Sequence, residues 1–333
     1  MSLNHPDSRF LALHNWLKND LNLEIHSLNP ASSDASFRRY FRVHHTQGTQ
    51  IVMDAPPDKE NITPFIQVDR LLARYGLPVP DILASNLQDG FLLLEDFGNR
   101  NLLHALNQES VELLYDKAMG ELFKLQSHVA LEGLNLNAYD RPLLLRELSI
   151  FYEWFLGGLL GLTLPSALTT TLNELLIQSA LEQSQVCVHR DFHSRNLMLR
   201  PDESLGIIDF QDAVIGPVTY DLVSLLRDCY IEWPQSDIER WLQHYHQRLR
   251  TADLTDTKYP QFKRWFDWMG MQRHLKAIGI FARLHLRDGK SGYLADIPRT
   301  LNYVTAVAAE YQEFSDFHQF LSTQIVPIYQ DFL

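Results

Sequence analysis

A short polar segment between two apolar runs decides the fold of this chain. It lies within VCVHRDFHSRNLML (residues 186–199), between the runs VCV and LML, and a third apolar run, LGIIDF, follows over residues 205–210. The apolar runs are rich in β-branched residues and lack a helical repeat, which favours short buried strands. Polar residues between such strands are held at a strand end. We therefore predict that residues 189–196 form a loop that faces a cleft.

The polar residues of this loop have the order and spacing of a phosphoryl-transfer site. Asn196 follows Asp191 of the His-Arg-Asp triplet by five residues, and Asp209 comes thirteen residues after Asn196. This is a catalytic-loop pattern of phosphoryl-transfer enzymes. The Asp191 carboxylate can align an acceptor hydroxyl and take its proton, and the oxygens of Asn196 and Asp209 suit Mg²⁺ at the phosphates of ATP. Each residue alone is typical of turns and caps, but the ordered set predicts catalysis.

Length and composition limit the possible classes of protein. The chain has 333 residues, which suggests about two structural units, and 45% of its residues are apolar. Its net charge of −12 argues against a general nucleic-acid binder. Two cysteines are too few for a disulfide framework and fit a reducing cytoplasm. The most apolar stretch, residues 155–164, has about half the length of a membrane span. We expect a cytoplasmic protein without membrane contact, and its oligomeric state stays open.

The pattern along the chain changes near residue 97. Strand-like runs cover residues 36–43, 50–53 and 91–94. With one helical stripe that begins at Thr63, they predict a small mixed sheet with one helix. Beyond Gly98, apolar residues recur every three or four positions, except in the polar hairpin. We predict a nucleotide-binding lobe at 1–97 and a catalytic and acceptor-binding helical lobe at 98–333.

These motifs resemble the aminoglycoside phosphotransferase and choline kinase-like superfamily. Within it, the chain is most similar to a bacterial branch of anomeric N-acetylmuramate/N-acetylglucosamine kinases of cell-wall peptidoglycan recycling. That similarity rests on DASFRRYFR (34–42), VMDAPP (52–57), FQDA (210–213) and YDLVSLLRD (220–228). It implies an α+β, two-lobed, protein-kinase-like fold with a small β-rich N-terminal lobe and a larger, mainly helical C-terminal lobe. It also implies an ATP-dependent kinase that acts on the anomeric hydroxyl of an N-acetylated amino sugar.

The resemblance places the nucleotide in the first lobe. The loop 31–36 takes the position of the phosphate-covering loop, with Ser33 and Ser36 as hydroxyl donors, and residues 93–98 resemble the hinge, with Glu95 and Phe97 at the adenine. The lysine that the family usually has on the third strand is missing here. Its cation could come from Arg38, Arg39 or Arg42, and we include Arg38 among the predicted nucleotide-binding residues.

The acceptor is expected in the second lobe. Residues 263–290 hold seven Lys and Arg against two Asp, which is either a solvated face or a region that attracts an anionic acceptor through Arg273, such as the lactyl carboxylate of N-acetylmuramate. Glu147 could bind sugar hydroxyls, and Asp212 could form the floor of the pocket. Asp221 is expected to cap a helix or to brace the catalytic loop.

Two alternative functions stay open. The chain could be another small-molecule phosphotransferase, for an amino alcohol or an aminoglycoside, although a basic acceptor region disfavours polycations. The missing lysine instead motivates a non-catalytic, nucleotide-binding pseudokinase. A protein kinase is disfavoured because the chain reaches the helix at Tyr220 soon after Asp209, which leaves no room for an activation loop.

Overall fold

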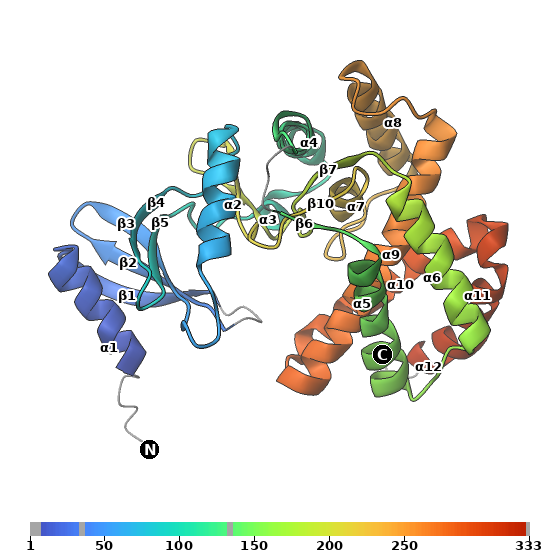
Figure 1. The fold of residues 1–333 in the computed structure, drawn as a ribbon, viewed down its shortest axis with the longest axis horizontal. Coiled ribbons are helices and arrows are strands. Elements are labelled where there is room, and N and C mark those ends of the chain that lie inside the picture. Colours follow the sequence, from blue (N-terminus) through green and yellow to red (C-terminus); the bar gives the residue numbers. More distant parts are fainter. Residues whose placement is uncertain (1–7, 33–36, 132–135, 331–333) are drawn as a thin grey trace. The chain divides into compact units, whose positions relative to one another are not determined.

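The computed structural model describes residues 8–32, 37–131 and 136–330. The chain divides into two compact units, which we describe separately (Figure 1). The sheet unit comprises Met1–Arg100 and Met198–Gln211, and the helical unit comprises Asn101–Leu197 and Asp212–Leu333. The segment 198–211, which includes Asp209, therefore belongs to the sheet unit.

The sheet unit is built on one five-stranded sheet. Its strands are β1 (Ile25–Ser32), β2 (Arg39–His45), β3 (Gly48–Asp54), β4 (Ile82–Asn86) and β5 (Phe91–Glu95), in the order β1-β2-β3-β5-β4. Every neighbouring pair is antiparallel, so the prediction of a mixed sheet was wrong. Short links join β2 to β3 and β4 to β5, and hairpin links of this kind produce antiparallel pairs. The predicted hairpin of residues 36–43 and 50–53 corresponds to β2 and β3.

Three helical segments and a separate two-stranded sheet make up the rest of the secondary structure described in this unit. They are α1 (Ser8–Asn15), the π-helical η1 (Trp16–Asp20), α2 (Thr63–Arg74), and the paired strands β8 (Leu197–Leu199) and β9 (Leu205–Ile207). Trp16 and Leu17 pack with Val43 and Val52 of the sheet to form a small core. This contact explains why the N-terminal helix is retained on the sheet, because its apolar face is buried there.

The helical unit contains most of the helices and one small sheet. Its helical segments are α3 (Leu102–Ala105), α4 (Val111–His128), α5 (Arg141–Ile150), η2 (Phe151–Leu160), α6 (Ser166–Leu181), α7 (Tyr220–Leu226), α8 (Gln235–Thr251), α9 (Tyr259–Asp288), η3 (Ser291–Asp296), α10 (Ile297–Glu310), η4 (Gln312–Phe314), α11 (Ser315–Phe320), η5 (Leu321–Ile325) and α12 (Val326–Gln330). The sheet has the order β6 (Asn137–Ala138), β10 (Val214–Pro217), β7 (Gln185–Val188). No helix in the described ranges is both long and apolar enough to cross a membrane.

Helix α9 forms the centre of the helical unit. It contacts α5, η2, α6, α7 and α10, and Figure 1 shows it running through the unit beside them. Its residues Met271, Leu275 and Ile278 are fully buried in the main core. Because neighbours surround α9, even charged residues of this helix are buried.

One glycine permits the close approach of α9 to the junction of α5 and η2. A Cβ at Gly279 would lie 2.6 Å from backbone atoms of Ile150 and Phe151. Backbone atoms cannot yield as a flexible side chain does, so we expect Gly279→Ala to lower the free energy of unfolding by about 1–3 kcal/mol. Thermal unfolding followed by circular dichroism measures this effect.

A second helical glycine provides a matched control. Gly120 lies within α4, and a Cβ there would meet no atom within 4 Å. Gly120→Ala should therefore be neutral or stabilising, by up to about 1 kcal/mol, because alanine favours the helix. A Gly279→Ala protein that melts at or above the wild-type temperature would show that α9 does not require this close contact.

Candidate functional site

The predicted catalytic loop lies in the helical unit, where two buried carboxyl groups hold its backbone. The loop follows β7, and the Asp221 carboxyl accepts hydrogen bonds from the backbone N–H groups of His189 (2.6 Å) and Arg190 (3.0 Å). Asp228, just beyond α7, accepts the N–H of Ser194 at 2.9 Å. Asp221 and Asp228 are 0% and 1% exposed. The prediction that Asp221 braces the loop is confirmed, whereas the role of Asp228 in the same motif was missed.

The loop also closes on itself around Asp191. The Asn196 Nδ2 donates to the carbonyl oxygen of Asp191 at 3.1 Å, and the N–H of His193 donates to the same oxygen at 3.0 Å. The N–H of Asp191 donates to Nδ1 of His189 at 3.2 Å. These bonds fix both sides of Asp191 and orient the amide of Asn196, so the polar residues of the motif form one ordered turn.

Positive side chains hold the Asp191 carboxylate in its ionised form. Burial alone raises its pKa, but nearby positive charges, chiefly those of Lys276, Arg273 and Arg190, outweigh burial and lower the pKa to about 2. Asp191 is therefore an anion at neutral pH. The residue before it, Arg190, has a backbone φ of +76°, a left-handed conformation that non-glycine residues adopt mostly where function or packing demands it.

Glu147, predicted to bind sugar hydroxyls, contacts two of the positive side chains that act on Asp191. It is 2% exposed, and its Oε1 contacts Arg190 Nη2 at 2.5 Å and Lys276 Nζ at 3.1 Å. The hydroxyl of Tyr139 donates to its Oε2. Burial raises the pKa of Glu147, but Lys276 and Arg190 outweigh it and lower the pKa. Both carboxylate oxygens are thus engaged by the protein, an arrangement suited to positioning Arg190 and Lys276.

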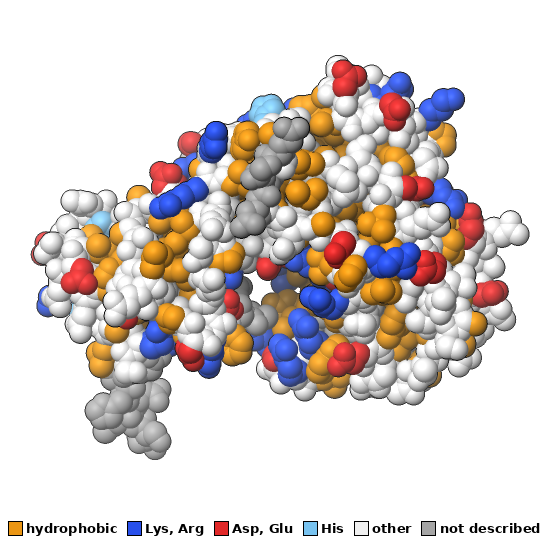
Figure 2. Space-filling model, in the orientation of Figure 1, with side chains coloured by type: hydrophobic (Ala, Val, Ile, Leu, Met, Phe, Trp, Pro, Cys, Tyr) orange, Lys and Arg blue, Asp and Glu red, His pale blue; other side chains and the backbone are white. Residues whose placement is uncertain are grey.

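The other predicted acceptor residues differ in accessibility. Asp212 is exposed, and its carbonyl accepts a long bond of 3.4 Å from Arg190 Nη1. Arg273 is only 5% exposed, with Nη1 3.5 Å from the sulfur of Cys229. The basic residues of α9 therefore differ in exposure, because Arg273 and Lys276 are buried, whereas Lys263 and Arg264 near its start are partly exposed and Arg287 is exposed near its C-terminal end. Figure 2 shows Lys and Arg side chains gathered where Figure 1 places that end.

Asp209 lies in the sheet unit, two residues after the end of β9. Its side chain is exposed, its φ is +66°, and its Oδ1 accepts a bond from Gln211 Nε2 at 2.8 Å. The next residue, Phe210, is fully buried and packs on Phe65 of α2 with ring centres 4.9 Å apart. This packing anchors the turn that carries Asp209. Carboxylate and amide oxygens, as in Asp209 and Asn196, are the hard ligands that fit Mg²⁺.

The three arginines considered as substitutes for the missing lysine have different partners. Arg39, together with Arg9, pairs with the fully buried carboxylate of Asp54. Arg42 Nε contacts Asp96 at 2.6 Å near the predicted hinge. Arg38 pairs with Glu60, which precedes α2, at 3.3 Å.

The residues predicted to form the hinge are held by Arg200, which sequence reasoning did not identify. Arg200 pairs with Glu95, and its guanidinium carbon lies 4.7 Å from the centre of the Phe97 ring. Phe97 is 5% exposed and packs so closely on Gly206 that a Cβ there would lie 2.4 Å from the ring. The predicted phosphate-loop residues Ser33 and Ser36 lie outside the described residues.

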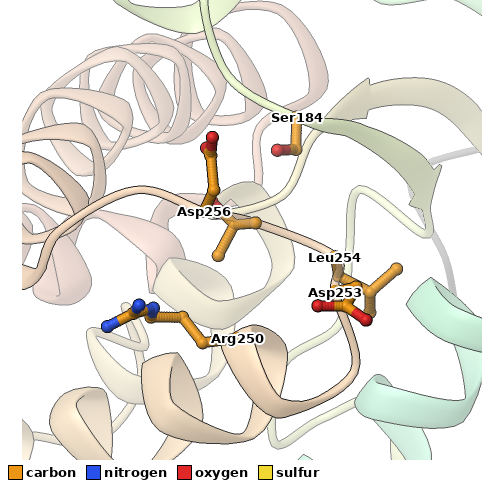
Figure 3. A pocket seen from close by; sticks show the side chains of 6 residues that line it. Ser184, Arg250, Asp253, Leu254 and Asp256 are labelled. Atoms are coloured by element: carbon orange, nitrogen blue, oxygen red, sulfur yellow. The ribbon is translucent and has the colours of Figure 1, made fainter.

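A cavity of about 460 Å³ lies elsewhere in the helical unit (Figure 3). Its lining residues are Ser184, Arg250, Asp253, Leu254, Thr255 and Asp256. Ser184 precedes β7 and the catalytic loop follows it, so a strand of about 13 Å separates them. None of the predicted site residues lines this cavity.

The sequence of this chain is similar to those of known phosphotransferases along most of its length. Residues 27–259 match a family model described as "Phosphotransferase enzyme family". An N-acetylmuramate/N-acetylglucosamine kinase of Pseudomonas putida is 42% identical over 95% of this chain and 96% of its own length. One of Neisseria meningitidis serogroup B is 42% identical over 94% and 95%.

Solved structures of low sequence identity share the fold. Choline kinase LicA from Streptococcus pneumoniae has a TM-score of 0.66 at 15% identity, covering 91% of this chain and all of that one. The ADP-bound aminoglycoside phosphotransferase APH(2'')-Ib has a TM-score of 0.59 at 16% identity, covering 89% and 97%. The predicted α+β, kinase-like fold class is thereby confirmed.

Proposed function

The chain belongs to the phosphotransferase enzyme family, and on that premise we propose that it is an ATP-dependent kinase for the anomeric hydroxyl of N-acetylmuramate and N-acetylglucosamine. The observation that carries this proposal is the ordered catalytic loop, in which Asp191 is anchored on both sides and ionised. The names of relatives 42% identical along nearly the whole chain support the choice of sugar. A role in recycling cell-wall peptidoglycan in the cytoplasm belongs to the same proposal.

In this reaction Asp191 aligns the acceptor and receives its proton. The C1 oxygen of the sugar forms a bond to the γ-phosphorus, the bond from that phosphorus to the β,γ-bridging oxygen breaks, and ADP leaves. The hydroxyl proton passes to a carboxylate oxygen of Asp191. A carboxylate with a pKa of about 2 is a weak base, so it takes the proton late, as phosphoryl transfer through a loose transition state allows.

Two further residues are proposed to hold Mg²⁺. Asn196 and Asp209 supply oxygens of the kind that bind this ion, and the bond from Asn196 Nδ2 to Asp191 fixes the orientation of the amide. When bound, Mg²⁺ neutralises charge on the phosphates.

The sheet unit is proposed to bind the nucleotide. Glu95 and Phe97 are predicted to belong to the adenine-reading hinge, and the contacts of Arg200 with both would keep them in place. Of the candidate cations, we favour Arg38. The pairing of Arg38 with Glu60 resembles the lysine–glutamate pair of kinases, whereas Arg39 shares the fully buried carboxylate of Asp54. Ser33 and Ser36 stay predicted phosphate ligands.

Other acceptors are less compatible with the charge near Asp191. Lys276, Arg273 and Arg190 all act on this carboxylate, and a polycationic aminoglycoside would have to approach them. A pseudokinase is disfavoured because a protein without catalysis would not require Asp191 to be held so closely.

A coupled assay of ADP release tests the function. We expect turnover with N-acetylmuramate and N-acetylglucosamine, little with N-acetylgalactosamine, choline or kanamycin, and loss of turnover with EDTA. Phosphorus NMR of the product should show a phosphate on C1. Asp191→Asn protein, purified identically, controls for contaminating kinases. A phosphate at C6, or ATP binding without turnover of any acceptor, would refute the proposal.

A further inference from the structure

The guanidinium of Arg195, within the catalytic loop, lies over an aromatic surface. Its central carbon is 3.6 Å from the centre of the Tyr230 ring and 5.8 Å from that of Tyr293. The nearest carboxylate, that of Asp296, is 3.9 Å away, beyond hydrogen-bond distance, and 39% of the Arg195 side chain is exposed. In the described part of the chain, no residue hydrogen-bonds to this guanidinium. Such a group presents a planar set of donors to solvent.

The backbone on both sides of Arg195 is fixed close to Asp191. Ser194 donates its N–H to Asp228 at 2.9 Å, and the Asn196 side chain bonds to the carbonyl of Asp191 at 3.1 Å. Arg195 is therefore the sequence neighbour of Asn196, whose side chain donates to the backbone carbonyl of Asp191. Arg195 and the Asp191 carboxylate thus belong to the same ordered loop, and both act electrostatically on His193.

The charges around Arg195 leave room for one anion. Arg299 donates to the carbonyl of Cys229 at 2.8 Å and to Asp296 at 3.3 Å. Two guanidinium groups thus share the carboxylate of Asp296, and the other carboxylate that acts on this group, that of Asp228, is 1% exposed and already accepts the N–H groups of Ser194 and Tyr230. An anionic ligand group would complete the pairing, and a carboxylate fits the two-pronged geometry of arginine.

The neighbouring aromatic rings point to an anion with an apolar part. Tyr293 stacks on Phe281 with ring centres 5.8 Å apart and an angle of 15°, and Tyr230 lies 6.2 Å from the same ring. These rings form an apolar surface beside the guanidinium on which a methyl group or a sugar face can pack. A free inorganic anion would make no use of that surface.

We propose that Arg195 binds the carboxylate of an acidic acceptor and so makes the enzyme favour N-acetylmuramate over N-acetylglucosamine. The two sugars differ by the lactyl ether of the former, which carries a carboxylate and a methyl group. The carboxylate would meet Arg195, and the methyl group would pack on Tyr230 and Tyr293. This inference rests on the proposed function and adds the residue that distinguishes the two acceptors.

Steady-state kinetics with both sugars test the proposal. Arg195→Gln should lower kcat/KM for N-acetylmuramate about 10–100-fold, mostly through KM, because a charge-assisted bond is lost. The value for N-acetylglucosamine should change by less than about twofold, since that sugar has no group for Arg195. Arg195→Lys keeps the charge but not the planar pair of donors, so its kcat/KM for N-acetylmuramate should lie between the values of wild type and Arg195→Gln.

Arg264 provides the matched control. It also stacks on a ring, 3.9 Å from the centre of Trp268, and pairs with Glu313 on another part of the helical unit. Arg264→Gln should leave kcat/KM for both sugars unchanged, and thermal unfolding checks that each variant is folded.

The outcomes separate this inference from the function on which it rests. If Arg195→Gln lowers kcat/KM equally for both sugars, Arg195 acts on the nucleotide or the loop and the subsite is wrong. Unchanged kinetics for both sugars also refute it. A wild-type enzyme that phosphorylates neither sugar overturns the proposed function itself. Selective loss with N-acetylmuramate supports both.

Discussion

Asp191→Asn is expected to lower kcat about 1,000-fold, in the middle of the range for removal of a positioned proton acceptor. The asparagine keeps the shape of the side chain but cannot take the proton of the acceptor hydroxyl. The backbone bonds of the loop involve the carbonyl and N–H of residue 191 and are retained. The defect should therefore appear in turnover and leave the dissociation constant of ATP within about threefold of wild type.

Rapid-quench measurement of ADP formation and a separate ATP titration distinguish these effects. The wild type should show no acid limb from Asp191 between pH 5 and 9, because its pKa is lowered to about 2 and it stays ionised throughout that range. A variant that retains more than a tenth of the wild-type kcat would exclude Asp191 as the proton acceptor.

The catalytic loop could be predicted because its information is local. Asp191 and Asn196 lie within six residues between two apolar strands, and the spacing alone indicates both the turn and the chemistry. The strands β2, β3 and β5 are similarly local. Helix α1 was not predicted, since a helix of 8 residues is too short to be stable by itself and forms with the support of packing on a distant sheet.

The buried charges near the loop could not be predicted in the same way. Helical periodicity assigns charged residues to solvent, but α9 is surrounded by other helices, so Arg273 and Lys276 are buried with Glu147 and Asp191 as partners. These pairings join elements more than 80 residues apart. No sequence pattern within one helix encodes such a contact.

The arginines of the sheet unit illustrate the same limit. Arg38, Arg39 and Arg42 are equivalent in the sequence as cations that could replace a lysine. Their partners, Glu60, Asp54 and Asp96, come from separate places in the chain. Only the fold separates an arginine that shares a fully buried carboxylate from one in a looser pair.

Asp221→Ala is expected to lower the free energy of unfolding by about 2–5 kcal/mol, because two buried N–H groups lose their acceptor. The same change should lower kcat about 100-fold, since displacement of a catalytic group by about 1 Å has effects of that size. Ser224→Ala on the same helix is the control. Ser224 is also fully buried, but its hydroxyl only returns to the carbonyl of Tyr220, so its loss should cost less than about 1 kcal/mol.

The pH dependence of the Asp221→Ala effect shows which force dominates at this carboxyl group. Burial raises its pKa to about 7 in spite of the hydrogen bonds from His189 and Arg190. The folded state then holds the proton more tightly than the unfolded chain, where the pKa has its ordinary value of 3.8. The stability that Asp221 contributes is therefore complete below pH 4 and declines as the pH rises towards 7. Urea unfolding of wild type and variant should give a larger difference at pH 5 than at pH 8. A difference that instead grows with pH would mean that the two N–H donors outweigh burial and keep Asp221 ionised.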